Sequence, residues 1–336
     1  MLAVLLSKSI VAKLCALLIA AALAFVLHIG LGSSSAVNLV DVLRELFAGY
    51  GGDEQANVIV WQLRMPRAVG CALIGAILGA AGSAFQSLFR NPLAEPYVLG
   101  VSSGAGIGGT VALMLGVSGA AYGLGKLGLA FVGGMLTLWL VVAIARKGGR
   151  ISITTMLIAG VVVSAMLASA MTAMLLAAGQ DTNQILRWLL GTTADLQWPR
   201  VETLAVVLLV CLAVLQTQTR ALNAFSVGEF TSERLGVDVP RLRAITLLTV
   251  TLMTAMAVGS AGIIGFLGLV APHIARRIVG LDLRISLLGS ALTGTAVLLF
   301  ADVIAQRAFE FMELPLGAVT AIIGAPMLLA LLRKQR

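Results

Sequence analysis

GSAGIIGFLGLVAPHIARR, residues 259–277, is the stretch of this chain that decides its fold class. It holds no acidic residue and no lysine or arginine before its closing arginine pair, and glycine recurs at every third position at Gly259, Gly262, Gly265 and Gly268. In water each glycine weakens a helix by about 1 kcal/mol relative to alanine. A bilayer offers two compensating reasons: small residues let helices approach closely, and a helix can break where its backbone lines a cavity. The arginine pair indicates the cytoplasmic end of a membrane span.

The composition of the whole chain agrees with a membrane protein. Of its 336 residues, 59% are hydrophobic and 11% are charged, whereas about a quarter of the residues of a soluble protein are charged. The net charge of +8 is scattered between apolar runs and forms no basic stripe with aromatic residues, which excludes nucleic-acid binding. Cys15, Cys71 and Cys211 each lie inside an apolar run, so we expect neither a disulfide framework nor a metal centre.

Apolar windows of about 20 residues can cross a bilayer, and the sequence predicts a single all-α polytopic domain over residues 1–336. The first window follows Lys8 and Lys13 and can be a signal peptide, but in a chain with many later spans a retained first helix is the better interpretation. The predicted spans are 14–31, 68–89, 98–117, 127–145, 154–178, 201–219, 244–261, 262–279, 285–305 and 316–332.

The distribution of Lys and Arg predicts the orientation. It places both termini in the cytoplasm, with long loops at 32–67 and 180–200 outside and a third long loop at 220–243 inside. The inner loop is expected to form one or two short helices. A short pattern occurs twice in the chain. Gly82-Ser83-Ala84 follows Arg67, and Gly259-Ser260-Ala261 follows Arg243 at a similar distance, on spans that are predicted to run in opposite directions. This pattern suggests an inverted repeat of the kind transporters have. Chance explains one short match equally well.

No catalytic, nucleotide-binding or ion-coupling motif is apparent. The glycine-rich runs 104–109 and 123–128 neither follow a strand nor open a βαβ unit. His28 and His273 are predicted at opposite membrane faces, each as a polar residue at the interface, so they cannot share a metal. No carboxylate is predicted deep in a span, and gradient-driven transporters usually need such a group. The lack of this carboxylate counts against gradient-driven transport. Because no nucleotide-binding motif is apparent either, the energy must come from another subunit or from an ion gradient.

Methionines 156, 171 and 174 share one face of the fifth predicted span. Adaptable packing is the simpler interpretation. The alternative is a soft wall for a bulky substrate, formed by Met171 and Met174.

Several motifs in the same order resemble those of a known family. The chain is similar to the permease subunits of the iron-siderophore, haem and vitamin B12 ABC importers (FecCD-type, type II importers). The resemblance is carried by Arg64-Met65-Pro66-Arg67, Gly82 to Gln86, Arg90 to Pro96, Leu99 to Ala105, Gly265 to Arg276, Glu313 to Gly317 and Gly324 to Pro326.

The resemblance implies a homodimer of ten-helix permeases in the cytoplasmic (inner) membrane, with two ATP-binding subunits and an external substrate-binding protein. The chain would bind no cofactor and would not be an enzyme itself, because ATP and Mg are used by the partner subunits. An iron chelate, a siderophore or haem, is the expected cargo. Vitamin B12 is the alternative, and a gradient-driven secondary transporter and a lipid-modifying membrane enzyme are the rival classes.

The resemblance also assigns residues to three places. ATPase coupling is expected within 220–243, at Gly228, Glu229, Phe230, Glu233, Arg234, Leu235 and Gly236, where Phe230 and Leu235 offer an apolar anchor. Docking of the binding protein is expected at Arg64, Arg67 and Arg307, although the third arginine is displaced by one position because Gln306 stands at its usual place. The pathway and its inner gate are expected at Asn91, Leu93, Thr154, Met171 and Met174. For the three arginines, the structural alternative is that they anchor helices at the lipid headgroups. For the gate, the structural alternative is an ordinary turn.

Overall fold

The computed structural model describes residues 8–32, 40, 42, 44–45, 54–117, 123–147, 150–309 and 312–334. Helices dominate these residues, and a hairpin of two-residue strands, β1 (Arg146–Lys147) and β2 (Arg150–Ile151), joins two of the helices. The long helices are α1 (Lys8–Gly30), α4 (Met65–Phe89), α6 (Leu124–Ala145), α7 (Ile153–Ala177), α9 (Trp198–Val227), α11 (Val239–Ala261), α13 (Leu283–Arg307) and α14 (Leu316–Lys334). The shorter elements are α3 (Glu54–Val58), the π-helical turn η1 (Ile59–Arg64), η2 (Pro96–Leu99), α5 (Val101–Met114), η4 (Gly179–Asp181), α8 (Thr182–Leu189), α10 (Glu229–Arg234) and α12 (Leu267–Val279).

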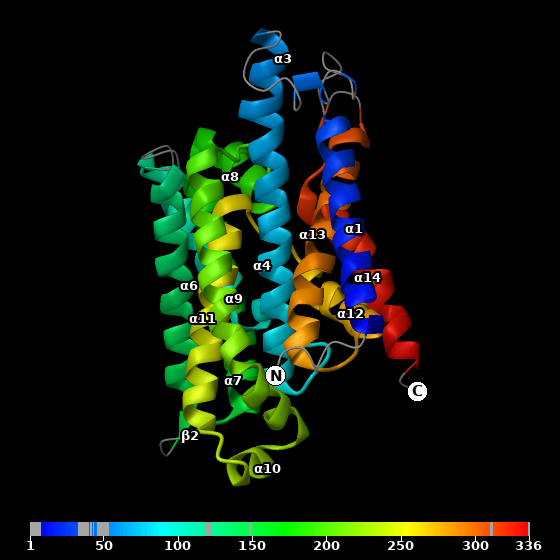
Figure 1. Ribbon diagram of the computed structural model, residues 1–336. Helices are drawn as coiled ribbons and strands as arrows, with labels where there is room; N and C mark the ends of the chain where they lie inside the picture. The colour runs from blue at the N-terminus through cyan, green and yellow to red at the C-terminus, as the bar shows by residue number, and fades with distance from the viewer. Residues whose placement is uncertain are drawn as a thin grey trace.

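Seven of the described helices are long and apolar enough to cross a membrane, which confirms the all-α polytopic fold. Each predicted span overlaps one of the helices above, and α8 forms within the predicted outer loop 180–200. The inner loop is shorter than predicted, because α9 continues to Val227 and α11 starts at Val239. In Figure 1, α10 lies at the end of the bundle where α1 starts and α14 finishes, while α3 lies at the opposite end.

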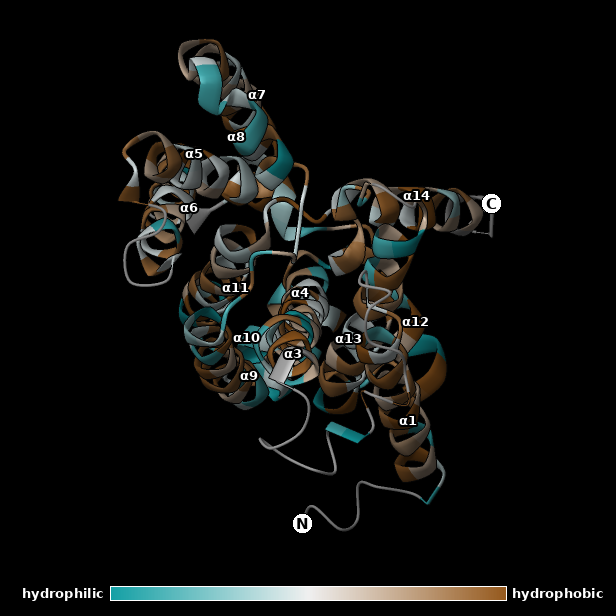
Figure 2. Cartoon of the chain, turned by 90° about the horizontal axis from the view of Figure 1, so that it is seen from above, coloured by the Kyte–Doolittle hydropathy of each residue, from teal (hydrophilic) through white to brown (hydrophobic). Residues whose placement is uncertain are grey.

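Helix α4 is the central element of the bundle. Seen along the bundle in Figure 2, it lies between α9 and α11 on one side and α1, α12 and α13 on the other. Glycines make these contacts close: a Cβ on Gly75 would meet the carbonyl of Gly294, and a Cβ on Gly82 would meet the carbonyl of Gly268. Small residues at crossing points are how membrane helices gain packing contacts. The glycine-rich sequence of α4 therefore fixes its central place.

The opening stretch of the sequence contains a break in the helix. Helix α11 ends at Ala261, residues 262–266 are not helical, and α12 starts only at Leu267. The predicted span 262–279 is therefore wrong in its first five residues. Gly262 has φ +75° and Phe266 has φ +65°, a left-handed conformation that is uncommon for a residue with a side chain.

Main-chain hydrogen bonds to two other segments satisfy the polar groups at this break. Thr192 N–H donates to the Ala261 carbonyl at 2.8 Å, and Ile263 N–H donates to the Leu189 carbonyl at 3.2 Å. At the start of α14, Gly317 N–H donates to the Leu190 carbonyl at 3.1 Å. Non-helical backbone inside a membrane needs such partners. We call this meeting of residues 189–192, 261–263 and 316–317 the backbone junction.

The glycine repeat serves more than one purpose. Gly259 packs closely, because a Cβ there would lie 2.8 Å from the Ala130 Cβ. A Cβ on Gly262 would overlap the Trp188 carbonyl. Gly265, in contrast, faces open space within this chain, with no atom within 4 Å of a Cβ placed there. Close packing, one of the two reasons offered for the repeat, explains Gly259 and Gly262 but not Gly265.

Candidate functional site

The first candidate site is helix α10 at the end of the bundle. Phe230 is 64% exposed and Leu235 is 69% exposed, while Glu229 forms an ion pair with Arg243 of α11 at 2.7 Å. The Arg234 guanidinium lies over the Phe230 ring, 4.3 Å from its centroid. The ion pair holds the helix to the bundle, and the two apolar side chains remain available for a partner.

Residues behind α10 connect it to the end of α4. The Phe225 ring lies close to two guanidinium groups, that of Arg243 at 5.5 Å and that of Arg90 at 5.3 Å from its centroid. Arg90 is the left-handed C-cap of α4 and directly precedes Asn91. The predicted coupling segment and the predicted gate are therefore linked through Glu229, Arg243, Phe225 and Arg90.

The predicted gate is a tight turn after α4. The Asn91 side chain accepts a hydrogen bond from Leu93 N–H at 2.9 Å, and both Asn91 and Thr154, in the first turn of α7, are exposed. The same connection reaches the helix break: Tyr97 Oη accepts a hydrogen bond from Ile264 N–H at 3.3 Å. A role in gating remains a prediction, but the connection that holds the turn contacts the helix break through Tyr97.

Two family motifs that are far apart in sequence meet between α4 and α12. Arg276 donates to Gln86 Oε1 at 2.9 Å and to the Ser83 carbonyl at 3.2 Å. Gln86 in turn donates to the Gly268 carbonyl at 3.3 Å. Arg276 thus binds α12 to α4 as well as marking the end of a span.

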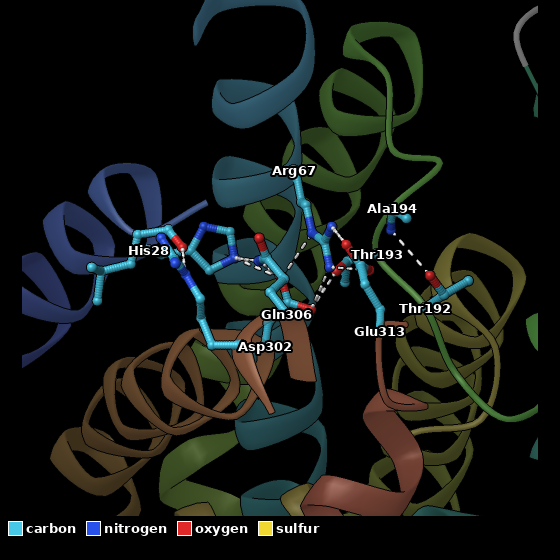
Figure 3. A network of polar contacts seen from close by, with 10 residues as sticks. His28, Arg67, Thr192, Thr193, Ala194, Asp302, Gln306 and Glu313 are labelled. Carbon is cyan, nitrogen blue, oxygen red and sulfur yellow. Dashed lines mark hydrogen bonds and ion pairs between the residues drawn. The ribbon is translucent and has the colours of Figure 1, made fainter. Parts of the chain in front are cut away.

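A buried polar network lies at the opposite end of the bundle (Figure 3). Asp302 of α13, 1% exposed, accepts hydrogen bonds from Arg67 at 3.0 and 3.1 Å and from Thr193 at 2.7 Å. His28 of α1 lies 2.6 Å from the same carboxylate, and Gln306 donates to it at 2.8 Å. Arg67 also forms an ion pair with Glu313 at 2.8 Å. The network joins α1, α4, α13 and two connecting segments.

This network bears on two expectations. His28 is buried at 2% exposure and bonded to Asp302, so its side chain packs within the bundle and does not face the lipid headgroups. Asp302, a carboxylate within the predicted span 285–305, lies near the end of α13 and not deep in it. It is paired with Arg67 and therefore is not a free ion-coupling group of the kind a gradient-driven transporter uses. Sequence analysis missed the role of His28, Asp302 and Glu313 because their bonded partners other than Gln306 lie 109 to 274 positions away.

His28, Cys71 and Asp302 also have the spacing of a metal site, with one ligand atom of each within 4.8 Å of the others. Their chemistry does not fit a metal ion. Both carboxylate oxygens of Asp302 already accept hydrogen bonds from the Arg67 guanidinium, whose positive charge would repel a cation. This cluster is an ionic network.

The three arginines predicted to dock a binding protein differ in exposure. Arg67 is buried in the network, and Arg64 is 6% exposed and donates to the Ile29 carbonyl at 2.9 Å. Arg307 is exposed and donates to the Leu31 carbonyl through Nε at 2.8 Å. Of the three, Arg307 is the one that an incoming carboxylate can reach directly. Their docking role remains a prediction.

The methionines of α7 divide between packing and exposure. Met156 is buried, and Met171 accepts a hydrogen bond from Thr110 Oγ1 at 3.3 Å and packs near Gly106 of α5. Met174 is half-buried and Met166 is 64% exposed. These contacts favour the packing interpretation for Met156 and Met171, and the pathway role of Met171 and Met174 stays a prediction.

Comparison with known proteins identifies the family. The model of the FecCD transport family matches residues 17–334. The chain belongs to this family. It is thus a multi-pass ABC importer permease of the FecCD type, and the family consists of transport subunits.

Named relatives of this FecCD permease extend over most of its length. It is 40% identical to the cobalamin import system permease protein BtuC of Halobacterium salinarum, over 84% of this chain and 76% of that one. It is 37% identical to the vitamin B12 import system permease protein BtuC of Escherichia coli, over 84% and 86% of the two chains. Among solved structures it resembles a transporter of the metal-chelate ABC type in an inward-facing conformation, with a TM-score of 0.83, 27% identity and coverage of 96% and 98%.

Proposed function

We propose that this permease imports a corrinoid of the vitamin B12 type, as the membrane-spanning subunit of a binding-protein-dependent ABC importer. The observation that carries the substrate is the identity of 40% and 37% to two cobalamin permeases over 84% of the chain. An iron chelate, the cargo expected from the sequence, is the second candidate. It is supported by the similarity to a transporter of the metal-chelate type.

The assembly we propose is a homodimer of this chain with two ATP-binding subunits at the α10 end and an external binding protein at the other end. Exposed Phe230 and Leu235 support the first contact, and exposed Arg307 supports the second. Orientation with both termini in the cytoplasm follows from the arginines near α10. Binding of ATP by the partners would shift the permease between outward-open and inward-open states, through differential affinity for the two.

The substrate is tested by uptake into proteoliposomes that contain the permease with its own ATP-binding subunits and binding protein. Labelled cyanocobalamin is offered, and unlabelled ferric siderophore or haem is added as competitor. We expect ATP-dependent accumulation of cobalamin that neither iron chelate reduces. Accumulation of a labelled ferric siderophore without cobalamin uptake would replace the corrinoid by the iron chelate and leave the importer class intact.

A further inference from the structure

A cavity of about 610 Å³ lies beside α8, at the end of the bundle opposite α10. It is enclosed by the N-terminal turns of α6 and α9, the end of α5, η1 and the segment that follows α8. The residues on which its chemistry depends are Lys126, Arg187, Trp188, Asp195 and Arg200. Three of these carry positive charge and one carries negative charge, so the described lining has an excess of cations.

Lys126 is buried without a hydrogen-bond acceptor among the described residues. Its side chain is 6% exposed, and its ammonium group lies 5.1 Å from the centroid of the Trp188 ring. The ring face stabilises a cation in part. It does not accept the three hydrogen bonds that an ammonium group can donate. The lysine lines the cavity, so its ammonium group is placed to bind an acceptor that enters there.

Arg200 is similarly buried and only partly satisfied. It is 6% exposed, one of its terminal nitrogens donates to the Asp195 carbonyl, and its Nε has no acceptor. The Asp195 residue is exposed and forms no ion pair with Lys126 or Arg200 within the described part of the chain. Gly123, at φ +91°, leaves space for the guanidinium, since a Cβ there would lie 2.8 Å from Arg200 Nε.

We propose that this cavity binds a small oxyanion, a phosphate group, between Lys126 and Arg200. These two buried cations lie on different helices and form no ion pair within the described part of the chain, and charge-assisted hydrogen bonds to such an oxyanion are the strong kind. Gln62, Gln184 and Gln197 line the same cavity and add amide donors. The proposal rests on this geometry and is independent of which substrate the permease carries.

The oxyanion can come from solution or from the headgroup of a phospholipid, and the experiment separates the two. Purified permease is titrated with inorganic phosphate at constant ionic strength, and the shift of the thermal transition gives the affinity. Lipid phosphorus is measured in an organic extract of the same preparation. The variants are Lys126→Gln and Arg200→Gln, with Lys126→Arg as the charge-conserving variant and Arg277→Gln as a control for an exposed arginine outside the cavity.

We expect Lys126→Gln and Arg200→Gln to weaken phosphate binding, or to lower bound lipid phosphorus, by about tenfold or more. Lys126→Arg and Arg277→Gln should behave like the wild type. A phosphate-induced shift identifies a dissolved anion, and loss of lipid phosphorus without such a shift identifies a headgroup. The proposal is overturned if folded Lys126→Gln and Arg200→Gln permeases match the wild type in both measurements. It is equally overturned if the wild type binds neither form of phosphate.

Discussion

At the scale of single residues, Glu95 stands out as a carboxylate in the connection between α4 and α5. Burial raises its pKa to about 7, although a hydrogen bond from Phe266 N–H lowers it in part. A carboxyl whose pKa is raised in the folded state stabilises that state when protonated. This contribution is present below the unfolded pKa of about 4.3 and is lost as the pH rises through about 7.

Replacement of Glu95 by glutamine should therefore remove part of the pH dependence of stability. We expect the melting temperature of the wild type to fall more between pH 5 and pH 8.5 than that of Glu95→Gln, and the variant to be the more stable protein at pH 8.5. Exposed Glu202→Gln is the matched control. Parallel melting curves for wild type and Glu95→Gln over this range would contradict the assignment.

Two glycines of the helix break, Gly262 and Gly265, allow a second prediction. Gly262→Ala introduces a Cβ that overlaps the Trp188 carbonyl at a positive φ, and we expect a loss of about 2 kcal/mol or more. Gly265→Ala meets no atom within 4 Å and should leave stability unchanged. The melting temperature and the folded yield in detergent measure both. Equal behaviour of the two variants would show that the backbone junction does not constrain Gly262.

At the scale of elements, the buried network around Asp302 fastens α1, α4 and α13 together. Removal of one partner from a buried ion pair leaves an uncompensated charge and costs about 3–5 kcal/mol. Asp302→Asn should therefore lower the melting temperature strongly, whereas Asp282→Asn, which loses a half-exposed ion pair with Arg284, should cost about 1 kcal/mol or less. A small shift for Asp302→Asn would indicate that Arg67 is held adequately by Glu313 alone.

Sequence patterns predicted the helices better than the contacts between them. Long apolar windows locate α4, α9 and α13 because hydropathy depends only on local composition. The break at 262–266 was one of two alternatives, because glycine is equally compatible with close helix packing and with non-helical backbone. The α10 segment was found through the family resemblance and through the apolar side chains of Phe230 and Leu235. The pairing of His28 with Asp302 was out of reach, because it links residues 274 positions apart.

At the scale of the whole molecule, the two ends of the bundle carry different chemistry. Apolar Phe230 and Leu235 are exposed at one end, and exposed Arg307 lies with the Asp302 network at the other. The central helix α4 contacts the Asp302 network through Arg67 near its start, and through Arg90 at its end it contacts the Phe225 ring behind α10. This arrangement fits a subunit that responds at one end to an event at the other.

Coupling through α10 is tested by the combined change Phe230→Ala and Glu233→Ala. We expect a folded complex in which ATP hydrolysis is no longer stimulated by loaded binding protein and uptake falls about tenfold or more, because docking surfaces depend on a few central apolar anchors. Leu281→Ala, an exposed apolar residue on the loop before α13, is the control. Normal uptake by vesicles that carry both α10 changes would exclude coupling at this helix.

The central claim, that this chain is an importer subunit driven by partner ATPases, is tested most directly by uptake into proteoliposomes with and without those partners. Vesicles of one preparation receive either the permease alone under an imposed proton or sodium gradient, or the complete complex with binding protein and internal ATP. We predict accumulation of labelled cobalamin or ferric chelate only in the complete, ATP-loaded vesicles. Gradient-driven uptake by the permease alone would contradict the account and identify a secondary transporter.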